Sequence, residues 1–270
     1  PISSALNTLN RTSLEAGALA ANLTDFTWTG ASGDALYSTD GNWYGGSAPS
    51  ATDDVYFNYI CGANCSVTLD QVSLGESLEM DLDFSGTLTQ QDSSSVVLGK
   101  TGLILRNGNF VGGSSSASLS LGSFKQFGGV FSAPDSSLSL VGSFANDNID
   151  SYFMRRAGSF THSSGYFKFG AQAAGDCDES VVQRLVTSVP TEFNDMVIDI
   201  YDNDCHGSDD AVFEFDQYHS KLLVHGNLQI DDGKIYWGLI DLEGDLNLSC
   251  ADGADVYGEC LSLNNTLRTV

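Results

Sequence analysis

From Phe26 onward, apolar and polar residues alternate with a period of two in many short runs. Gly, Ser, Asn and Asp separate these runs, and no amphipathic helical pattern lies between them. A period of two bounded by turn residues is typical of β-strands, whereas βαβ units need a helix between strands. The sequence therefore predicts an all-β protein. We expect strands within 66–70, 78–84, 85–89, 103–105, 118–121, 137–140, 166–169, 196–200, 211–215, 222–224, 227–230 and 245–248.

The spacing of these runs is more informative than the runs themselves. Ser-Leu-Ser-Leu occurs at 118 and again at 137, and related Gly-x-Leu phrases begin at Gly226 and Gly244. A loose repeat of about 20 residues, built from strands and turns, is typical of a β-solenoid, in which each coil buries its apolar face against the next. A sandwich or a jelly roll also has short strands, but it does not by itself produce this rhythm. We therefore favour the solenoid.

These patterns divide the chain into four regions. Residues 1–25 have loose helical spacing and are expected to form an N-terminal arm or short helix, which either frays or docks on a neighbouring subunit. An N-terminal cap follows over 26–65, and the solenoid runs over 66–248. The stretch at about 145–192 breaks the rhythm, so we interpret it as an insertion or long loop outside the coils. A C-terminal disulfide loop and an end strand occupy 249–270.

The composition is acidic, with 11 Lys and Arg against 35 Asp and Glu, a net charge of −24 and a pI near 4.1. This charge argues against nucleic acid and anionic membrane surfaces as partners. The hydrophobic content of 41% is too high for a disordered chain. No apolar run approaches the ~20 residues of a membrane span, so we expect no membrane insertion. The chain begins at Pro1 without a methionine, and we expect a processed or excised form.

Six cysteines suggest disulfides and an oxidising environment. Their local grouping favours the pairs Cys61–Cys65, Cys177–Cys205 and Cys250–Cys260, although other connectivities are open. A zinc site is the alternative, and only Cys205 followed by His206 comes near its usual spacing. Disulfides together with the acidic composition favour a secreted or cell-surface location.

Five Asn-x-Ser/Thr sequons are present, and in a chain this rich in Asn, Ser and Thr several would arise by chance. They become glycosylation sites only where the source organism glycosylates such sequons. The sequon asparagines are Asn10, Asn22, Asn64, Asn247 and Asn264.

The segment after the arm resembles a known type of protein. It holds Phe26-Thr27-Trp28-Thr29-Gly30, then Asn42-Trp43, Pro49 and Asp53-Asp54-Val55-Tyr56-Phe57, followed by Gly-x-Leu rungs. This layout resembles the opening module of secreted autotransporter-like and adhesin β-solenoids of bacteria, over about 26–144. The resemblance implies a right-handed, single-stranded β-helix, extracellular display and an adhesive or structural role. It brings no catalytic motif. The cysteines depart from that pattern, because rungs of such proteins are usually poor in cysteine.

The aromatic residues of this segment have two interpretations. Trp28, Trp43 and Phe57 stand next to turn residues, where they suit a cap that covers the strand edges at the open end of a solenoid. Alternatively, exposed Trp28 and Trp43 stack on sugars of a glycan.

Calcium is the cofactor that the sequence favours, although none is certain. The densest acidic cluster holds Asp202, Asp204, Asp209 and Asp210, and carboxylate oxygens in such turns are typical Ca²⁺ ligands. The cluster lacks the terminal Glu of an EF-hand loop, so a solvated acidic loop is the competing interpretation.

No catalytic site is predicted. The few basic residues are scattered, and the four histidines His162, His206, His219 and His225 form no tight motif. The sequence also lacks a Gly-x-Ser-x-Gly elbow and a Walker loop. We therefore expect no enzyme, and a polysaccharide-active β-helix is the least favoured function.

The favoured function is that of an extracellular structural or adhesive surface protein, a self-assembling subunit of a filament or surface layer. The expected partners are further copies, which bind through the solenoid ends and the N-terminal arm. The alternative is a glycan-binding module of a larger adhesin that contacts cell-surface glycans.

Overall fold

The computed structural model describes residues 26–63, 65–142, 149–173, 181–202, 211–215, 221–232, 234–236, 239–248 and 267–269. Within them the protein is a stack of parallel β-strands, with only two short 3-10 helices, η1 (Asp40–Asn42) and η2 (Tyr59–Cys61). Every pairing between the named strands of these residues is parallel. None of these residues forms a helix that is long and apolar enough to span a membrane.

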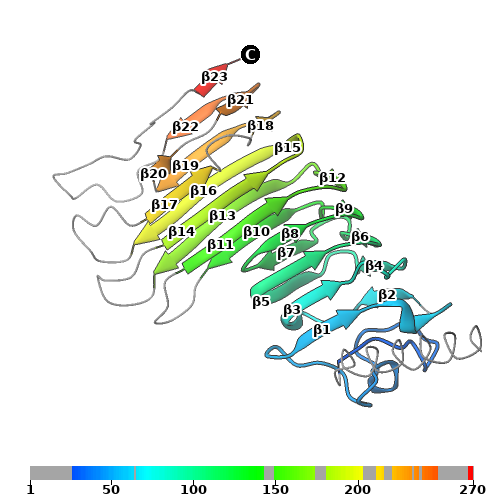
Figure 1. The fold of residues 1–270 in the computed structure, drawn as a ribbon. Coiled ribbons are helices and arrows are strands. Elements are labelled where there is room, and N and C mark those ends of the chain that lie inside the picture. The colour runs from blue at the N-terminus through cyan, green and yellow to red at the C-terminus, as the bar shows by residue number, and fades with distance from the viewer. Residues whose placement is uncertain are drawn as a thin grey trace, which may run out of the picture.

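The strands stand in three columns along the stack (Figure 1). The first column starts with β1 (Asp54–Phe57) and continues with β3 (Ser73–Met80), β5 (Ser95–Leu105), β8 (Phe124–Gln126), β11 (Ile149–Arg155), β14 (Val181–Thr187), β17 (Ala211–Phe215) and β20 (Lys234–Tyr236). The second column leaves β5 and holds β7 (Ser118–Leu121), β10 (Ser137–Gly142), β13 (Tyr166–Ala173), β16 (Asp195–Asp202), β19 (Leu228–Asp232) and β22 (Leu246–Leu248).

The third column occupies the remaining flank. It holds a five-stranded sheet of β2 (Ser66–Leu69), β4 (Thr87–Gln90), β6 (Asn109–Val111), β9 (Val130–Ser132) and β12 (Ser159–Thr161). A four-stranded sheet continues beyond β12 on the same flank (Figure 1), with β15 (Thr191–Phe193), β18 (Lys221–Val224), β21 (Leu239–Leu242) and β23 (Leu267–Thr269). From β7 to β22 the chain visits the three columns in turn, so each of these coils adds one strand to each column. The all-β prediction is confirmed, and the curled parallel sheets are compatible with a β-helix or solenoid.

The core forms because matching positions of successive coils face inward together. In the second column Leu119 pairs with Leu138, which pairs with Phe167. In the third column the ring of Phe131 stacks on those of Phe110 and Phe160, with centroid distances of 5.1 and 5.4 Å. A single coil has no second layer to cover these side chains, and stacking removes them from water. The alternation seen in the sequence is therefore the signature of the buried face.

The coils lengthen towards the middle of the chain. Leu119 pairs with Leu138, and Leu138 pairs with Phe167. The separation along the sequence is larger for the second pair than for the first. The insertion predicted at about 145–192 is therefore wrong for the described part of that stretch, because β11 to β15 lie inside the columns. In the described residues, the regular rhythm is broken because the partner strands lie further apart along the sequence.

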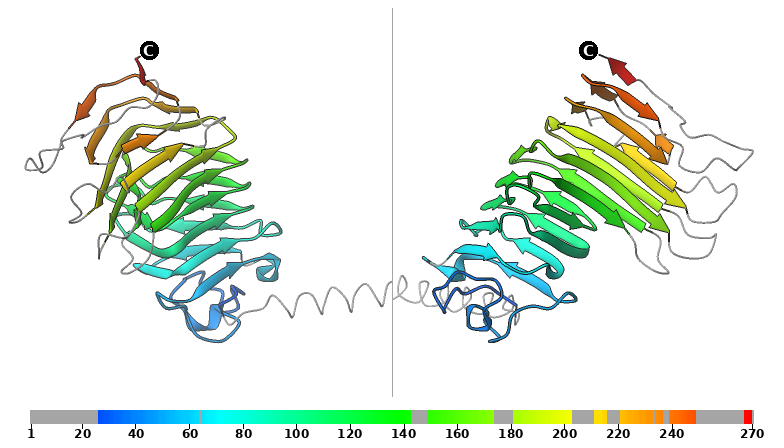
Figure 2. Two further views of the ribbon diagram at one scale, coloured as in Figure 1. Left: turned by 60° about the vertical axis from the view of Figure 1, so that its left-hand side comes forward. Right: turned by 180° about the vertical axis from the view of Figure 1, so that it is seen from behind.

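The N-terminal end of the stack is covered by 26–48. Isolated bridges join Thr27 to Tyr56 in β1 and Leu36 to Thr68 in β2, so this segment occupies the outer edges of the first strands of two columns. The indoles of Trp28 and Trp43 meet edge to face at a centroid distance of 5.2 Å. Figure 2 shows this segment at one end of the stack and β23 at the other.

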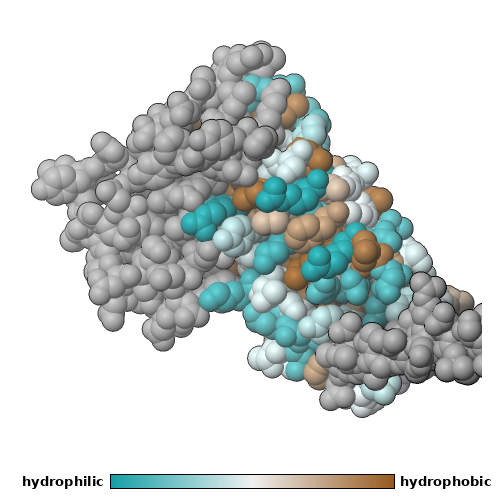
Figure 3. Space-filling view, in the orientation of Figure 1, coloured by the Kyte–Doolittle hydropathy of each residue, from teal (hydrophilic) through white to brown (hydrophobic). Residues whose placement is uncertain are grey.

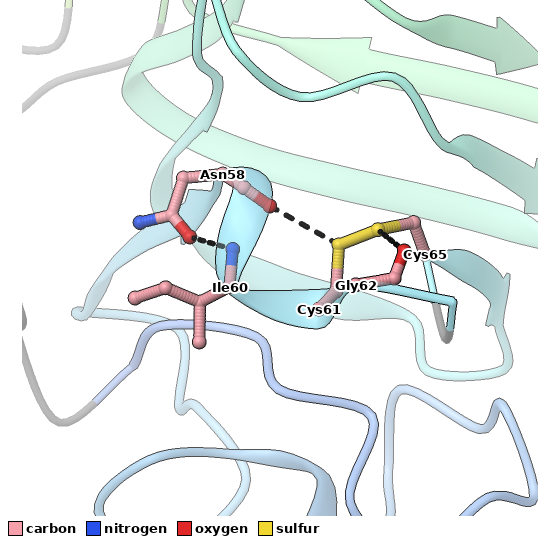
Figure 4. The surroundings of a disulfide bond; sticks show 5 residues. All are labelled: Asn58, Ile60, Cys61, Gly62 and Cys65. Carbon is pink, nitrogen blue, oxygen red and sulfur yellow. Dashed lines mark hydrogen bonds between the residues drawn. A yellow bond between two sulfur atoms is a disulfide. The ribbon is translucent and has the colours of Figure 1, made fainter.

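A disulfide closes the turn between η2 and β2. Cys61 and Cys65 are bonded, as the sequence predicted, and Asn58 precedes η2 as its N-cap (Figure 4). The side-chain oxygen of Asn58 accepts a hydrogen bond from the Ile60 amide at 3.0 Å. The cap and the disulfide together fix how the chain passes from the first column to the third.

The long strand β5 divides the first two columns at Gly102. Its residues Ser95–Val97 pair with β7, and Leu103–Leu105 pair with β8. Gly102 has a φ of +69°, and a Cβ at this position would overlap the carbonyl oxygen of Ser123. Gly102 thus meets two demands at once, a left-handed backbone and close contact with the next coil.

Replacing Gly102 with Ala is expected to destabilise the protein by about 3 kcal/mol or more, since the strain of a left-handed alanine adds to a steric clash. Gly46→Ala is the matched control, because Gly46 also has a positive φ, +74°, but open space around its Cβ position. This control is expected to cost only about 1–2 kcal/mol. Urea unfolding followed by circular dichroism measures both variants, and equal losses would contradict the steric account.

Candidate functional site

Four polar side chains from four successive coils meet on the flank of the third column. Glu192 lies in the middle of β15, whereas His162, His225 and Glu243 each follow directly after β12, β18 and β21. Val224 pairs with Leu242, so the next residues, His225 and Glu243, stand side by side on adjacent coils. The parallel register therefore gathers side chains that the sequence places far apart.

The geometry of this cluster is close and polar. The potential ligand atoms of His162, Glu192 and His225 all lie within 4.8 Å of one another. Both ring nitrogens of His225 face carboxylates, with Nδ1 2.8 Å from Oε2 of Glu243 and Nε2 3.2 Å from Oε2 of Glu192. The ring centroids of His162 and His225 are 5.4 Å apart. We call these four residues the His–Glu cluster.

The two carboxylates change the acid–base behaviour of His225. Hydrogen bonds to Glu243 first, and then to Glu192, raise the pKa of His225 above its ordinary value because they stabilise the imidazolium. The His225 side chain is one-third exposed, so water screens part of this effect.

A small hollow adjoins the cluster on the side of His162. Aromatic and aliphatic side chains line one part of it, and polar groups line another. Its lining includes Phe160, His162, Ser163, Tyr166, Phe193 and Asn194. The cluster therefore lies beside a hollow with a partly apolar lining.

A second polar group lies inside the stack and has a structural role. Arg155 is 3% exposed, and its Nε donates to Oε1 of Gln126 at 2.9 Å on the preceding coil. Its Nη1 donates to the carbonyl of Pro190 at 2.9 Å and to Oγ1 of Thr191 at 3.0 Å on the following coil. Burial lowers the pKa of Arg155 to about 10. The guanidinium thus braces three coils through hydrogen bonds.

The glycan-stacking hypothesis for Trp28 and Trp43 is wrong for this structure. Trp28 is 0% exposed and Trp43 is 2% exposed, and Trp43 Nε1 donates to the carbonyl of Tyr37 at 2.8 Å. Both rings belong to the buried N-terminal end, so neither presents a face to a sugar. Of the two interpretations, the structure therefore agrees with the one in which these tryptophans form part of a cap.

Other predicted sites fall mostly outside the described residues. Of the calcium cluster only the backbone of Asp202, the last residue of β16, is described, and Asp204, Asp209 and Asp210 lie outside. Of the sequons, Asn247 is exposed on β22. The remaining predicted residues, Asn10, Asn22, Asn64, Asn264, Cys177, Cys205, Cys250 and Cys260, also lie outside the described part of the chain.

The sequence analysis missed the His–Glu cluster. His162 and His225 lie far apart along the chain, and no short motif joins them. Aligning the sequences of successive coils would have revealed them, since each histidine directly follows a strand of the third column. The change in coil length prevented this alignment from the sequence alone.

Comparisons with known proteins give no further guide to function. No protein-family model matches the chain, and neither the curated proteins nor the solved structures contain a significant match. The function must therefore be argued from the geometry of this chain.

In metal-free protein the pKa of His225 is expected to lie above the ordinary histidine value, and Glu243→Gln is expected to lower it, because an amide stabilises the imidazolium less than a carboxylate does. Glu192→Gln is expected to lower it less, because Glu192 makes the smaller contribution. The titration is followed through the imidazole signals by NMR in EDTA. Glu79→Gln, which removes the carboxylate that pairs with Arg106 far from the cluster, serves as the control. Identical curves for wild type and Glu243→Gln would contradict this account.

Proposed function

We propose that the protein is an extracellular structural or adhesive surface protein. In this proposal the chain is a single-stranded, right-handed β-helix, and copies associate end to end to form a filament or surface layer. Right-handed crossovers between parallel strands are the general rule, which supports the handedness. The disulfide Cys61–Cys65 supports an oxidising, extracellular environment.

The observation that carries this proposal is the difference between the two ends of the stack. The N-terminal strand edges are covered by 26–48 through the bridges of Thr27 and Leu36. Within the described residues, β20, β22 and β23 each pair on one side only. Unpaired edges of parallel strands are templates for another chain. In a filament, these unpaired edges of one copy would meet the covered end of the next, a head-to-tail contact that gives the assembly a fixed direction.

The surface favours end contacts over side contacts. A net charge of −24 on 270 residues makes copies repel one another when they lie side by side. On the face seen in Figure 3, hydrophobic and hydrophilic side chains are interspersed over the described residues. The backbone edge carries no net charge, so pairing there escapes most of this repulsion.

Leu246 offers a test of the open edge in β22. The Leu228 amide donates to the carbonyl of Asp245 at 3.0 Å, so the backbone groups of Asp245 face β19. The backbone N–H of Leu246 therefore points away from the stack, because neighbouring residues of a strand alternate in direction. Proline is tolerated at such a position and removes this N–H.

Leu246→Pro is expected to weaken association by about ten-fold or more, because a missing donor and a proline ring block the edge. Leu246→Ala is the matched control: it loses the same apolar side chain but keeps the N–H. Light scattering after size exclusion, with electron microscopy at high concentration, measures assembly, and circular dichroism checks the fold. Monomeric wild-type protein at high concentration would refute the proposal, as would equal assembly of the two variants.

A further inference from the structure

We propose that the His–Glu cluster binds Zn²⁺, with His162, Glu192 and His225 as ligands and Glu243 as the residue that orients His225. This site would link three successive coils of the stack. The inference stands apart from the proposed end-to-end assembly, because it rests on side chains of the third column and not on the ends.

Two of the three ligands already have suitable spacing. In a tetrahedral zinc site with metal–ligand bonds of about 2.0–2.2 Å, ligand atoms lie about 3.3–3.5 Å apart. Nε2 of His225 and Oε2 of Glu192 are 3.2 Å apart. The ligand atom of His162 lies within 4.8 Å of both. A small rotation of the partly exposed His162 ring would close the site.

The hydrogen-bond partners of Nδ1 in the two histidines leave Nε2 as the nitrogen that can bind a metal. Nδ1 of His225 is 2.8 Å from Oε2 of Glu243, and Nδ1 of His162 is 3.1 Å from the carbonyl oxygen of Ser163. Zinc-binding histidines commonly donate their second ring N–H to a carboxylate or a backbone carbonyl, which fixes the tautomer and the ring direction. Both histidines of the cluster have such an acceptor in place.

The ligand types favour zinc over calcium. Imidazole nitrogens suit Zn²⁺, whereas Ca²⁺ takes six to eight oxygen ligands, which two histidines and one carboxylate cannot supply. The carboxylates of Glu192 and Glu243 offset the charge of the ion. Three protein ligands leave a fourth position for water or for a group of another molecule.

Calorimetric titration of the EDTA-treated, dialysed full chain with Zn²⁺ at about pH 7.5 tests the proposal. We expect one Zn²⁺ per chain, and we expect the binding to be lost in His162→Gln and in His225→Gln. Glu243→Gln is expected to weaken binding by about 10–100-fold, as loss of an orienting carboxylate does elsewhere. His206→Gln and His219→Gln, which change the other two histidines of the chain, are matched controls that should bind as wild type. Circular dichroism in EDTA checks the fold of each variant.

Absorption of the Co²⁺-loaded wild-type chain gives a second measurement that needs no variant. We expect the bands of a tetrahedral or five-coordinate ion with nitrogen and oxygen ligands. A thiolate charge-transfer band would instead place the metal on cysteines and overturn the proposal. Unchanged Zn²⁺ binding in His225→Gln, or no binding by the wild-type chain, would overturn it as well.

Discussion

The register between parallel strands is the constraint on which the rest of this structure depends. Because each strand pairs in parallel with the strand one coil away, a given position of a coil always meets the same position of the next. Inward positions thereby form columns of large apolar side chains, such as Phe110, Phe131 and Phe160. The same register joins Arg155 to its neighbours above and below and brings the His–Glu cluster together.

Each strand that local alternation predicted overlaps a strand of the structure, because an inward position must be apolar whatever lies in the next coil, but β8, β11 and β14 were among the strands not predicted. The prediction failed where inward positions are polar. Gln126 and Arg155 are buried and hydrogen-bond to each other and to backbone carbonyls across coils, and the buried Gln183 donates from Nε2 to the carbonyl of Leu140. In the sequence Arg155 and Gln183 resemble surface residues, and together with the broken repeat rhythm this made 145–192 look like an insertion or loop. Only the neighbouring coils supply the hydrogen-bond partners that make these residues tolerable inside.

The candidate site could not be predicted, since its distances depend on coil length. The step along the sequence from Phe131 to its partner Phe160 is longer than the step from Phe110 to Phe131. An error of one position in the register moves a side chain to the opposite face of its strand. His162 and His225 are separated by two of the longer coils, so a uniform repeat cannot align them. Trp28 and Trp43, by contrast, were assigned to the right segment, and burial decided between their two interpretations.

The direction of the ladder hydrogen bonds has a mechanical consequence. These bonds join one coil to the next, so they lie along the length of the stack (Figure 2). A tensile load along that length, applied to the C-terminal end, opens one coil interface at a time, and adding coils does not raise the rupture force. A transverse load must instead shear the bonds of several interfaces together. Arg155 holds three coils through one guanidinium and raises the resistance to peeling at its own level. A rod of this design is therefore mechanically anisotropic, compliant to axial peeling and stiff against sideways drag.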